Sequence, residues 1–507
     1  MSLEQVRKQG YGFASYPFVK LFNYKEKKGE KSKKGEKKFS FVKQLLFGDY
    51  IKVYIKNKNF ETITEDEKTY IKVRCRNEDG YILPETDIQA DRILEVNFVD
   101  VGQGDGCHIV TPKDEHYIID AGVGDNMFRF LKWRFNLAKS KIPPPALKAV
   151  ISHPDSDHYK GFLKVFEQPK GLKQKLSFDY VYHNGIFEMG DREEEEKLGK
   201  KVKAGKNKYL TEIFDTDKKA KAHLKKVEKE SLYEKTLLSA LNNQKNVKFE
   251  ALSGDENNKF YKDGNLEIDI LGPITETVDG EKVLRYFDGV GPTKNGHSVI
   301  LMLKIGKARI IIGGDLNKKA EEYLLEKYTG ADVKKINRFL KEETDEAKIE
   351  ELKNEIKEVI NKARQYFQSD VAKACHHGSH DFSVDFLRSV NPVATVISSG
   401  DDESYCHPRP DSLGTIGKFS RGERPMIFST ELARSSKEFF DLSKVPKGKK
   451  KERIVTVYGM INLRTDGEKM IIAQKLERKA PARHWDIHKL EWNDMSKVFE
   501  YIFEEKE

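Results

Sequence analysis

The chain has 507 residues, of which 38% are hydrophobic and 34% are charged. This length exceeds one ordinary core and predicts two or three domains, and the high charged fraction predicts solvated insertions around a normal core. No run of about 18 apolar residues occurs, so we expect no membrane partner. The net charge of +9 permits a polyanionic partner.

The four cysteines are widely spaced and form no zinc-finger pattern. The N-terminus also lacks the apolar centre of a signal peptide. We therefore expect a reduced, cytoplasmic protein.

The first 90 residues divide into two predicted segments. Residues 1–38 carry eight lysines between Lys25 and Lys38, which is typical of a solvated loop or of a contact with a polyanion. Residues 39–90 alternate polar and apolar side chains in short strands. This second segment loosely resembles a bacterial SH3-type barrel, which implies a small β module that docks a protein partner. The alternative is a β-extension packed on the main domain.

The most informative stretch begins with the apolar run 149–151, which predicts a buried strand. His153 and Asp155 follow two residues apart, so their side chains leave an extended segment on one side. Asp157 and His158 turn toward a second point nearby. Such a cluster meets the needs of two adjacent metal ions with nitrogen and oxygen ligands, although a turn with solvated histidines is the alternative.

Other candidate site residues also follow apolar runs. A predicted hairpin, 298–305 and 308–312, leads into Asp315, and the run 371–375 leads into His376. The run 393–397 ends in Ser398. We therefore expect these residues to converge at one rim of a sheet sandwich.

The pattern His-x-Asp-x-Asp-His resembles the variant metal motif of the metallo-β-lactamase superfamily, specifically the soluble domain of the ComEC-like DNA-internalisation competence family. Five further stretches match that family in order: Phe98 to Asp105, Ile118 to Gly122, Ile312 to Asp315, Lys373 to Ser379 and Tyr405 to Pro408. The resemblance implies an α/β fold, a four-layer αββα sandwich. We expect the N-terminal small β-barrel and charged helical insertions to be added to this sandwich.

The resemblance also implies a metal site of two divalent ions. One ion would bind His153 and Asp155, and the other would bind Asp157, His158 and His376, with Asp315 bridging them. His297 is our candidate for the missing ligand of the first ion, with His183 as the second choice. Asp155, the first aspartate of His-x-Asp-x-Asp-His, adds an oxygen ligand and makes the site oxygen-rich, so both Zn and Mn are candidates. Cys375 and Cys406 lie in site stretches, but we expect small buried residues rather than ligands.

Further roles follow from the same resemblance. Lys373 would clamp a phosphate oxygen, the alternative being a surface lysine. His407 and Ser379 would orient a phosphate or protonate the leaving oxygen. We expect His377 and His380 to be supporting neighbours. Three aspartates, Asp100, Asp105 and Asp120, would support the site from behind.

The remaining boundaries come from composition. We expect the catalytic domain at 91–430, with charged insertions at about 190–246 and 317–368. Residues 431–507 should form a hairpin, from runs at 454–458 and 470–472 around a turn at Thr465, followed by a helical extension.

The implied function is a metal-dependent phosphodiesterase or nuclease that acts on DNA or RNA through a metal-activated hydroxide, with Lys373, His407 and Asp157 as catalytic residues. One alternative is a hydrolase of another ester, such as a phosphocholine ester, lactone or thioester. The other is a scaffold or docking protein without catalysis.

Overall fold

The computed structural model describes residues 3–26, 37–76, 78–255, 259–400, 406–430, 459–480 and 483–503. Three predicted features lie mostly or wholly outside these ranges. They are the lysine-rich stretch between Lys25 and Lys38, the residue Tyr405, and the run 454–458.

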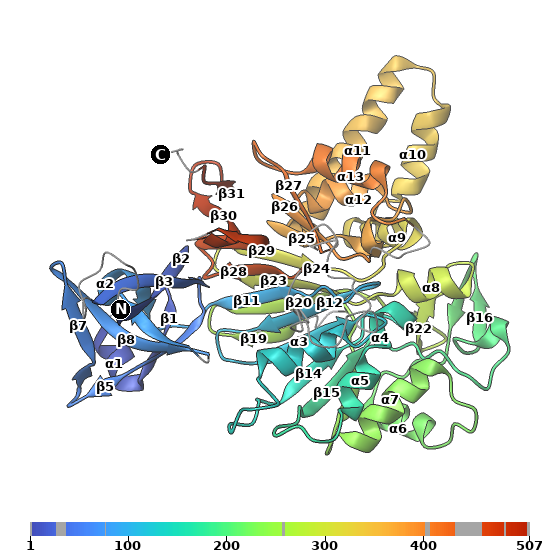
Figure 1. Ribbon diagram of the computed structural model, residues 1–507. Coiled ribbons are helices and arrows are strands. Elements are labelled where there is room, and N and C mark those ends of the chain that lie inside the picture. The colour runs from blue at the N-terminus through green and yellow to red at the C-terminus, as the bar shows by residue number, and fades with distance from the viewer. Residues whose placement is uncertain are drawn as a thin grey trace, which may run out of the picture.

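Two large sheets pack face to face in the main body of the molecule (Figure 1). The first has ten strands. In pairing order they are β18 (Lys248–Ala251), β15 (Phe178–His183), β14 (Leu147–Val150), β13 (His116–Ala121), β12 (Gly106–Val110), β11 (Leu94–Phe98), β28 (Ile461–Thr465), β29 (Lys469–Ala480), β30 (Arg483–Asn493) and β31 (Val498–Tyr501). The pairs from β18 to β13 are parallel, and the others are antiparallel.

The second sheet has seven strands. In pairing order they are β19 (Lys259–Asp263), β20 (Leu266–Gly272), β23 (Ile300–Ile305), β24 (Ala308–Ile312), β25 (Val371–Lys373), β26 (Ala394–Ile397) and β27 (Met426–Ser429). The predicted hairpin is β23 and β24, and the pairs from β24 to β27 are parallel.

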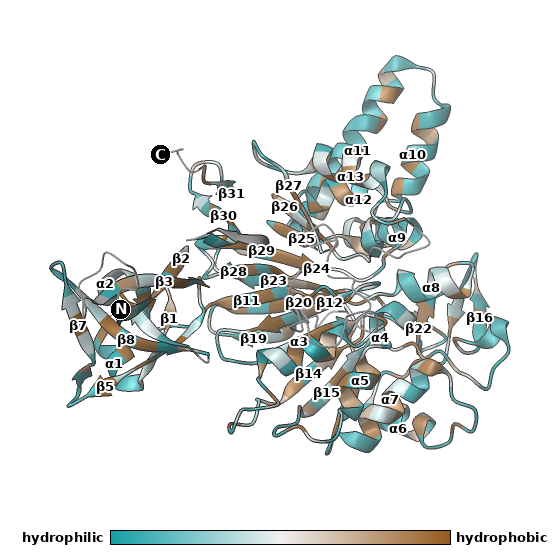
Figure 2. Cartoon of the chain, viewed as in Figure 1, coloured by the Kyte–Doolittle hydropathy of each residue, from teal (hydrophilic) through white to brown (hydrophobic). Residues whose placement is uncertain are grey.

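The core between the sheets explains why their strands are almost continuously apolar. Leu303, Ile310 and Val396 from one sheet, and Val96 and Ile461 from the other, are fully buried in one cluster. A strand whose two faces are both buried has an almost unbroken run of hydrophobic residues. Figure 2 shows these strands in brown, whereas helices α10 and α11 are largely hydrophilic.

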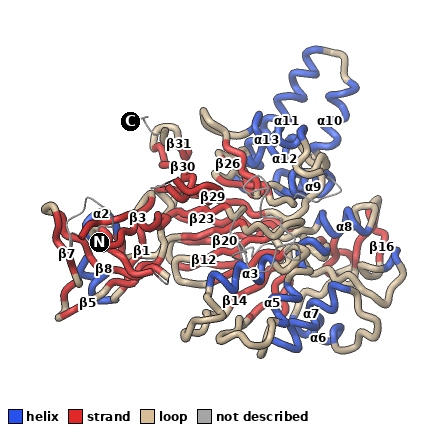
Figure 3. The backbone as a smooth tube through the Cα atoms, in the orientation of Figure 1, coloured by secondary structure: helices blue, strands red, loops and turns tan. Residues whose placement is uncertain are grey.

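Helices cover both outer faces, which gives four layers in the order predicted (Figure 3). The ten-stranded sheet is covered by α3 (Asn126–Arg134), α4 (Ser156–Tyr159), α5 (Phe162–Glu167), α6 (Asp217–Leu224) and α7 (Leu232–Asn243). The seven-stranded sheet is covered by α9 (Lys318–Thr329), α10 (Val333–Glu342), α11 (Glu346–Phe367) and α12 (Val384–Val390), with α13 (Pro410–Phe419) beside them. No described helix is both long and apolar enough to cross a membrane.

The two predicted insertions differ in structure. Residues 317–368 are helical as expected, because they form α9, α10 and α11. The region 190–246 is mixed: it contains η1 (Glu194–Glu196), β16 (Lys201–Ala204), β17 (Asn207–Leu210), α6 and α7. Strands β16 and β17 form a small sheet with β21 (Glu276–Val278) and β22 (Glu281–Arg285), and α8 (Val290–Gly296) follows.

The N-terminal region is an antiparallel sheet with its own apolar core (Figure 1). It begins within the segment that we separated at residue 38, so the two N-terminal segments form one unit. The strands are β1 (Tyr11–Ala14), β2 (Phe18–Glu26), β3 (Lys37–Leu46), β4 (Tyr50–Val53), β7 (Thr62–Glu65), β8 (Lys68–Cys75), β9 (Glu78–Ile82) and β10 (Ile88–Gln89). Helices α1 (Leu3–Gln9) and α2 (Pro84–Asp87) and the pair β5 (Ile55–Lys56) and β6 (Asn59–Phe60) accompany them. The SH3-type description and a protein partner stay predictions.

The C-terminal region departs from our expectation. The predicted hairpin turn at Thr465 exists, between β28 and β29, but Arg483–Asn493 forms β30 and not a helix. The helical prediction is wrong because Trp485 and Ile487 alternate with polar residues, a period-two pattern that buries one face of a strand. Both residues pack on a cluster around Phe47.

Truncation of the core between the sheets should destabilise the protein measurably. Leu303 is fully buried in β23, so Leu303→Ala should lower the free energy of unfolding by about 2–5 kcal/mol through the lost contacts and the cavity left behind. Ile142 is 77% exposed, and Ile142→Ala should change it by less than about 0.5 kcal/mol. Urea denaturation compares the two variants, and equal effects would contradict the assigned core.

Candidate metal centre

The candidate site lies where strands of both sheets end. Strand β14 leads into the loop that carries His153 and into α4, which carries Asp157 and His158. Strand β24 leads to Asp315, and β25 leads into the turn η2 (Cys375–Gly378). The predicted convergence at one rim of the sandwich is therefore what the structure contains.

Four side chains form a group with metal-ligand geometry: Asp157, His158, Asp315 and His377. Asp315 Oδ2 lies 3.2 Å from His158 Nε2 and 3.1 Å from His377 Nε2. Asp157 lies 3.9 Å from His158 Nε2 through Oδ1 and 3.4 Å from His377 Nε2 through Oδ2. Ligand atoms of a tetrahedral ion with bonds of about 2.1 Å are about 3.4 Å apart, so these four fit one ion.

A carboxylate behind His158 fixes the orientation of its ring. Asp120 Oδ2 lies 2.8 Å from His158 Nδ1, and Asp120 also accepts hydrogen bonds from the backbone and hydroxyl of Ser152. With Nδ1 occupied by Asp120, the ring directs Nε2 at the group of four. This is the common arrangement in which a carboxylate orients a metal-binding imidazole. The expected supporting role of Asp120 agrees with these contacts.

His377 is held in a similar way. Its Nδ1 lies 2.9 Å from the carbonyl oxygen of Ser398 and 3.3 Å from Asp105 Oδ1. Asp105 also pairs with the amine of Lys373, which lies 4.0 Å from Asp315 Oδ1. Lys373 is only 4% exposed, so its charge acts inside the protein, between two carboxylates.

A glycine allows the loops of the site to meet. Gly104 has a φ of +96°, and a Cβ at this position would lie 1.7 Å from the carbonyl oxygen of Asp157. The neighbouring amide of Asp105 lies 3.2 Å from the same oxygen. Only glycine permits both this backbone conformation and this approach. The turn 101–105 is therefore in direct contact with α4, which carries the candidate ligands Asp157 and His158.

The electrostatics of the site favour a cation. Burial opposes protonation of His158, but the carboxylates of Asp315, Asp120 and Asp157 outweigh it and raise the pKa of His158 well above its usual value. The pKa of His377 is likewise well above its usual value, because Asp315 and Asp105 outweigh burial. The carboxylates that hold protons on these rings would equally attract a divalent ion.

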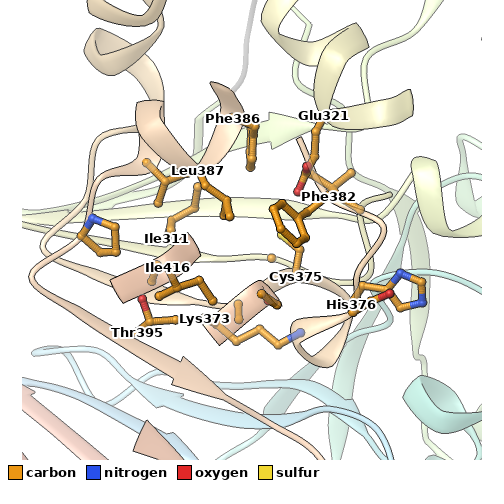
Figure 4. A pocket seen from close by; sticks show the side chains of 18 of the residues that line it. Ile311, Glu321, Lys373, Cys375, His376, Phe382, Phe386, Leu387, Thr395 and Ile416 are labelled. Atoms are coloured by element: carbon orange, nitrogen blue, oxygen red, sulfur yellow. The ribbon is translucent and has the colours of Figure 1, made fainter. Parts of the chain in front are cut away.

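The structure brings His377, and not His376, into the group of four. The two residues share a turn in which both have positive φ, 48° at His376 and 53° at His377. Figure 4 shows an apolar pocket beside the site, whose lining includes Phe386 and Leu387. The His376 ring lies at the edge of this pocket and points away from these apolar side chains. The sequence predicts a turn with site residues here, because a pair of histidines follows a strand. The backbone angles of the turn determine which of the two rings faces the other ligands.

The other expected ligands of the first ion are less assembled. His153 is buried, its ring centroid lies 4.1 Å from that of His158, and its Nε2 has no hydrogen-bond partner among the described residues. Asp155 caps α4 and lies 3.4 Å from Lys294 Nζ. The contact of Lys294 with Asp155 could not be predicted from the sequence, because a single lysine in a short polar helix has no distinguishing pattern.

Neither candidate for the missing ligand joins a ligand group within the part of the chain that the structure describes. His297 Nε2 donates to the carbonyl oxygen of Arg285 at 2.6 Å. His183 Nδ1 accepts from the amide of Gly185 at 3.0 Å. Burial lowers the pKa of His297 to about 4 and that of His183 to about 3, so both rings are neutral.

A cavity of about 590 Å³ is lined by three of the four grouped residues, Asp157, Asp315 and His377, and His158 lies behind them. Its lining includes the expected residues Asp155, Asp157, Asp315, His376, His377, Ser379, His380 and His407, together with Gln103, Ser156, Asn295, Asp381 and Arg409. Burial and the neighbouring His377 and His376 lower the pKa of His407 to about 4. His407 is therefore uncharged at neutral pH, which suits proton acceptance better than protonation of a leaving oxygen.

Lys373 does not line this cavity, so the expected clamp on a substrate phosphate has no geometric support among the described residues. Cys375 lies beside the apolar cluster of the seven-stranded sheet and Cys406 is exposed. Neither thiol belongs to a ligand group of the described residues.

Comparison with known proteins adds little. No protein-family model and no curated protein matches the chain. The solved structure of Tm1679, described as a metal-dependent hydrolase of the beta-lactamase superfamily, aligns with 66% of this chain and 95% of its own, at 13% identity and a TM-score of 0.30. A TM-score this low does not establish a shared fold.

Substitution of Asp120 tests whether this carboxylate orients the His158 ring for metal binding. Asp120→Asn keeps the size of the side chain and tolerates the positive φ of 56° at this position, but it weakens the acceptor for Nδ1. We expect affinity for Zn²⁺ or Mn²⁺ to fall about 10- to 100-fold, measured by competition with a chromogenic chelator. The control is Asp125→Asn, which alters an exposed carboxylate paired with Arg129. Equal affinities in the two variants would contradict the assigned role.

Proposed function

We propose that this protein is a metal-dependent hydrolase of the metallo-β-lactamase superfamily that cleaves phosphodiester bonds in DNA or RNA. The observation that carries the proposal is the group of Asp157, His158, Asp315 and His377 beside an open cavity. The four layers of the fold and the ordered motifs that resemble the ComEC-like family support the superfamily.

The four grouped residues would hold a divalent ion, and their mixture of imidazoles and carboxylates suits Zn²⁺ or Mn²⁺. Such an ion would lower the pKa of a water molecule and offset negative charge on a phosphoryl group. A second ion would engage His153, whose Nε2 is buried without a hydrogen bond among the described residues. For Asp155 to join it, the ion pair with Lys294 would have to open.

The cavity supplies groups suited to a phosphodiester. Arg409 lines it with His376, His380 and His407, and a guanidinium binds phosphate oxygens in a bidentate manner. The neutral imidazole of His407 is placed to accept a proton from a water molecule in the cavity or to hydrogen-bond a phosphate oxygen. Asp120 and Asp105 keep His158 and His377 in position throughout.

Removal of one candidate ligand should abolish catalysis without unfolding the protein. Asp157→Ala should lower metal-dependent cleavage of single-stranded DNA, double-stranded DNA, RNA or a chromogenic phosphodiester at least about 10³-fold, because oriented charge at the reacting centre supplies several kcal/mol. Assays with Mn²⁺, Mg²⁺, Zn²⁺ or chelator identify the substrate and the metal. Chelation should give the same loss in the wild-type protein.

The matched control is Glu358→Gln on the exposed face of α11, which should leave the rate unchanged. Turnover of phosphocholine esters, lactones or thioesters in place of phosphodiesters would redirect the proposal to another ester. Undiminished cleavage by Asp157→Ala would remove the proposed metal centre from the reaction.

A further inference from the structure

A second cavity, of about 420 Å³, lies between the N-terminal sheet and the ten-stranded sheet. Its walls come from β3 and the end of β8 on one side, and from α3, β28, β29 and β30 on the other. It shares no lining residue with the cavity at the metal centre. The volume falls within the usual range for small-molecule sites.

The lining of this cavity is strongly basic. Five cationic residues line it: Lys43, Arg76, Arg134, Arg464 and Lys475. Two anionic residues, Asp49 and Glu78, line it as well. Cationic residues therefore outnumber anionic ones at this surface, and one more carboxylate, that of Glu95, lies behind it.

Glu95 is shared between two guanidinium groups. Arg134 binds both of its oxygens at 2.9 Å, and Arg464 Nη1 lies 2.6 Å from Oε1. Arg464 is 3% exposed, and its Nε has no hydrogen bond or ion pair among the described residues. Burial lowers the pKa of Arg464 to about 10 despite the opposing effect of the Asp49 carboxylate, and nearby Arg76 and Arg92 also lower it. Arg464 also lies 3.9 Å from the carboxylate of Asp49. Two carboxylates, those of Glu95 and Asp49, do not balance the three guanidiniums of Arg76, Arg134 and Arg464, so an incoming anion would stabilise this wall.

The same cavity contains flat aromatic surfaces. Trp133 and Trp485 both line it, and they are two of the three tryptophans in the chain. The guanidinium of Arg76 stacks over Trp133 at 3.7 Å, and it remains accessible to solvent. Guanidinium groups bind phosphate oxygens, and indole rings stack on nucleobases for about 1–3 kcal/mol per base.

We propose that this cavity binds a nucleoside phosphate, with Arg76, Arg134 and Arg464 receiving the phosphate and an indole ring receiving the base. The site is separate from the metal centre and does not depend on the function proposed above. Because one wall comes from the N-terminal sheet and the other from the sandwich, the ligand would hold these two parts together. Its source is a free nucleotide or the terminal nucleotide of a strand.

Calorimetric titration of the full-length protein, without added metal, tests the proposal. The probes are ATP, AMP, adenosine, inorganic phosphate and a short 5′-phosphorylated oligonucleotide. We expect ATP to bind more tightly than AMP, phosphate to bind weakly, and adenosine to bind least, since charge dominates recognition. Binding of the oligonucleotide without binding of ATP or AMP would assign the site to strand ends.

Substitutions in the lining test whether ATP binds in this cavity. Arg134→Gln and Arg76→Gln should each weaken ATP binding about tenfold or more. The control Arg129→Gln changes the same charge on the same helix, but its partner Asp125 is at the surface, so binding should persist. Arg76 is accessible to solvent, so Arg76→Gln keeps the test valid where Arg134→Gln unfolds the protein. Asp157→Ala should bind ATP normally, which separates this site from the metal centre.

Two results would overturn the proposal. One is the absence of measurable heat with every probe at millimolar concentration, which would make the cavity a water-filled gap. The other is wild-type affinity for ATP in both Arg76→Gln and Arg134→Gln.

Discussion

The convergence of four carboxylates at one buried point is the constraint on which the site depends. Asp105, Asp120, Asp157 and Asp315 are all within reach of His158 or His377, and Lys373 is the lysine that pairs with them among the described residues. Negative charges this close are tolerated in a protein interior only when cations compensate them. Without a metal ion, protons on the imidazoles of His158 and His377 supply positive charge. A bound divalent ion would supply it in their place.

This constraint explains the surrounding backbone. Glycine at position 104 lets the turn 101–105 approach the Asp157 carbonyl, and the hydroxyl of Ser298 lies 2.9 Å from the amide of Asp315 and 3.3 Å from His153 Nδ1. The strands deliver each loop to the same rim, and these short polar contacts then fix the loops against one another. These contacts hold the carboxylates close to the imidazoles and to Lys373, whose positive charges offset the repulsion.

Much of this could be predicted from the sequence, because it rests on local patterns. Apolar runs that end in Asp or His identified the strands and the loops of the site, and composition identified the insertion at 317–368 that forms α9, α10 and α11. What failed depends on three-dimensional context. The choice of His377 over His376 depends on two backbone torsions, and the pairing of Lys373 with Asp105 joins residues far apart in the sequence.

The ends of the chain were the least predictable for a related reason. Strand β30 pairs along its edge with β29, and its alternating residues Trp485 and Ile487 pack on the cluster around Phe47, which lies far from β30 in the sequence. The extent of the N-terminal sheet likewise depends on β2 pairing with β3 across the lysine-rich stretch. We predicted a basic segment at residues 1–38 and a helical extension after the C-terminal hairpin, whereas strand pairing gives β2, the start of β3 and β30 there.

The pairing of β11 with β28 also has a consequence for biogenesis. Leu94 lies opposite Thr465, so the middle of the ten-stranded sheet joins segments from opposite ends of the sandwich sequence. During translation, β11 leaves the ribosome long before its neighbour exists and exposes an open, apolar edge for the whole interval. Such long-range closure is slow, so the edge of β11 stays open to intermolecular pairing until β28 has been made and has folded onto it.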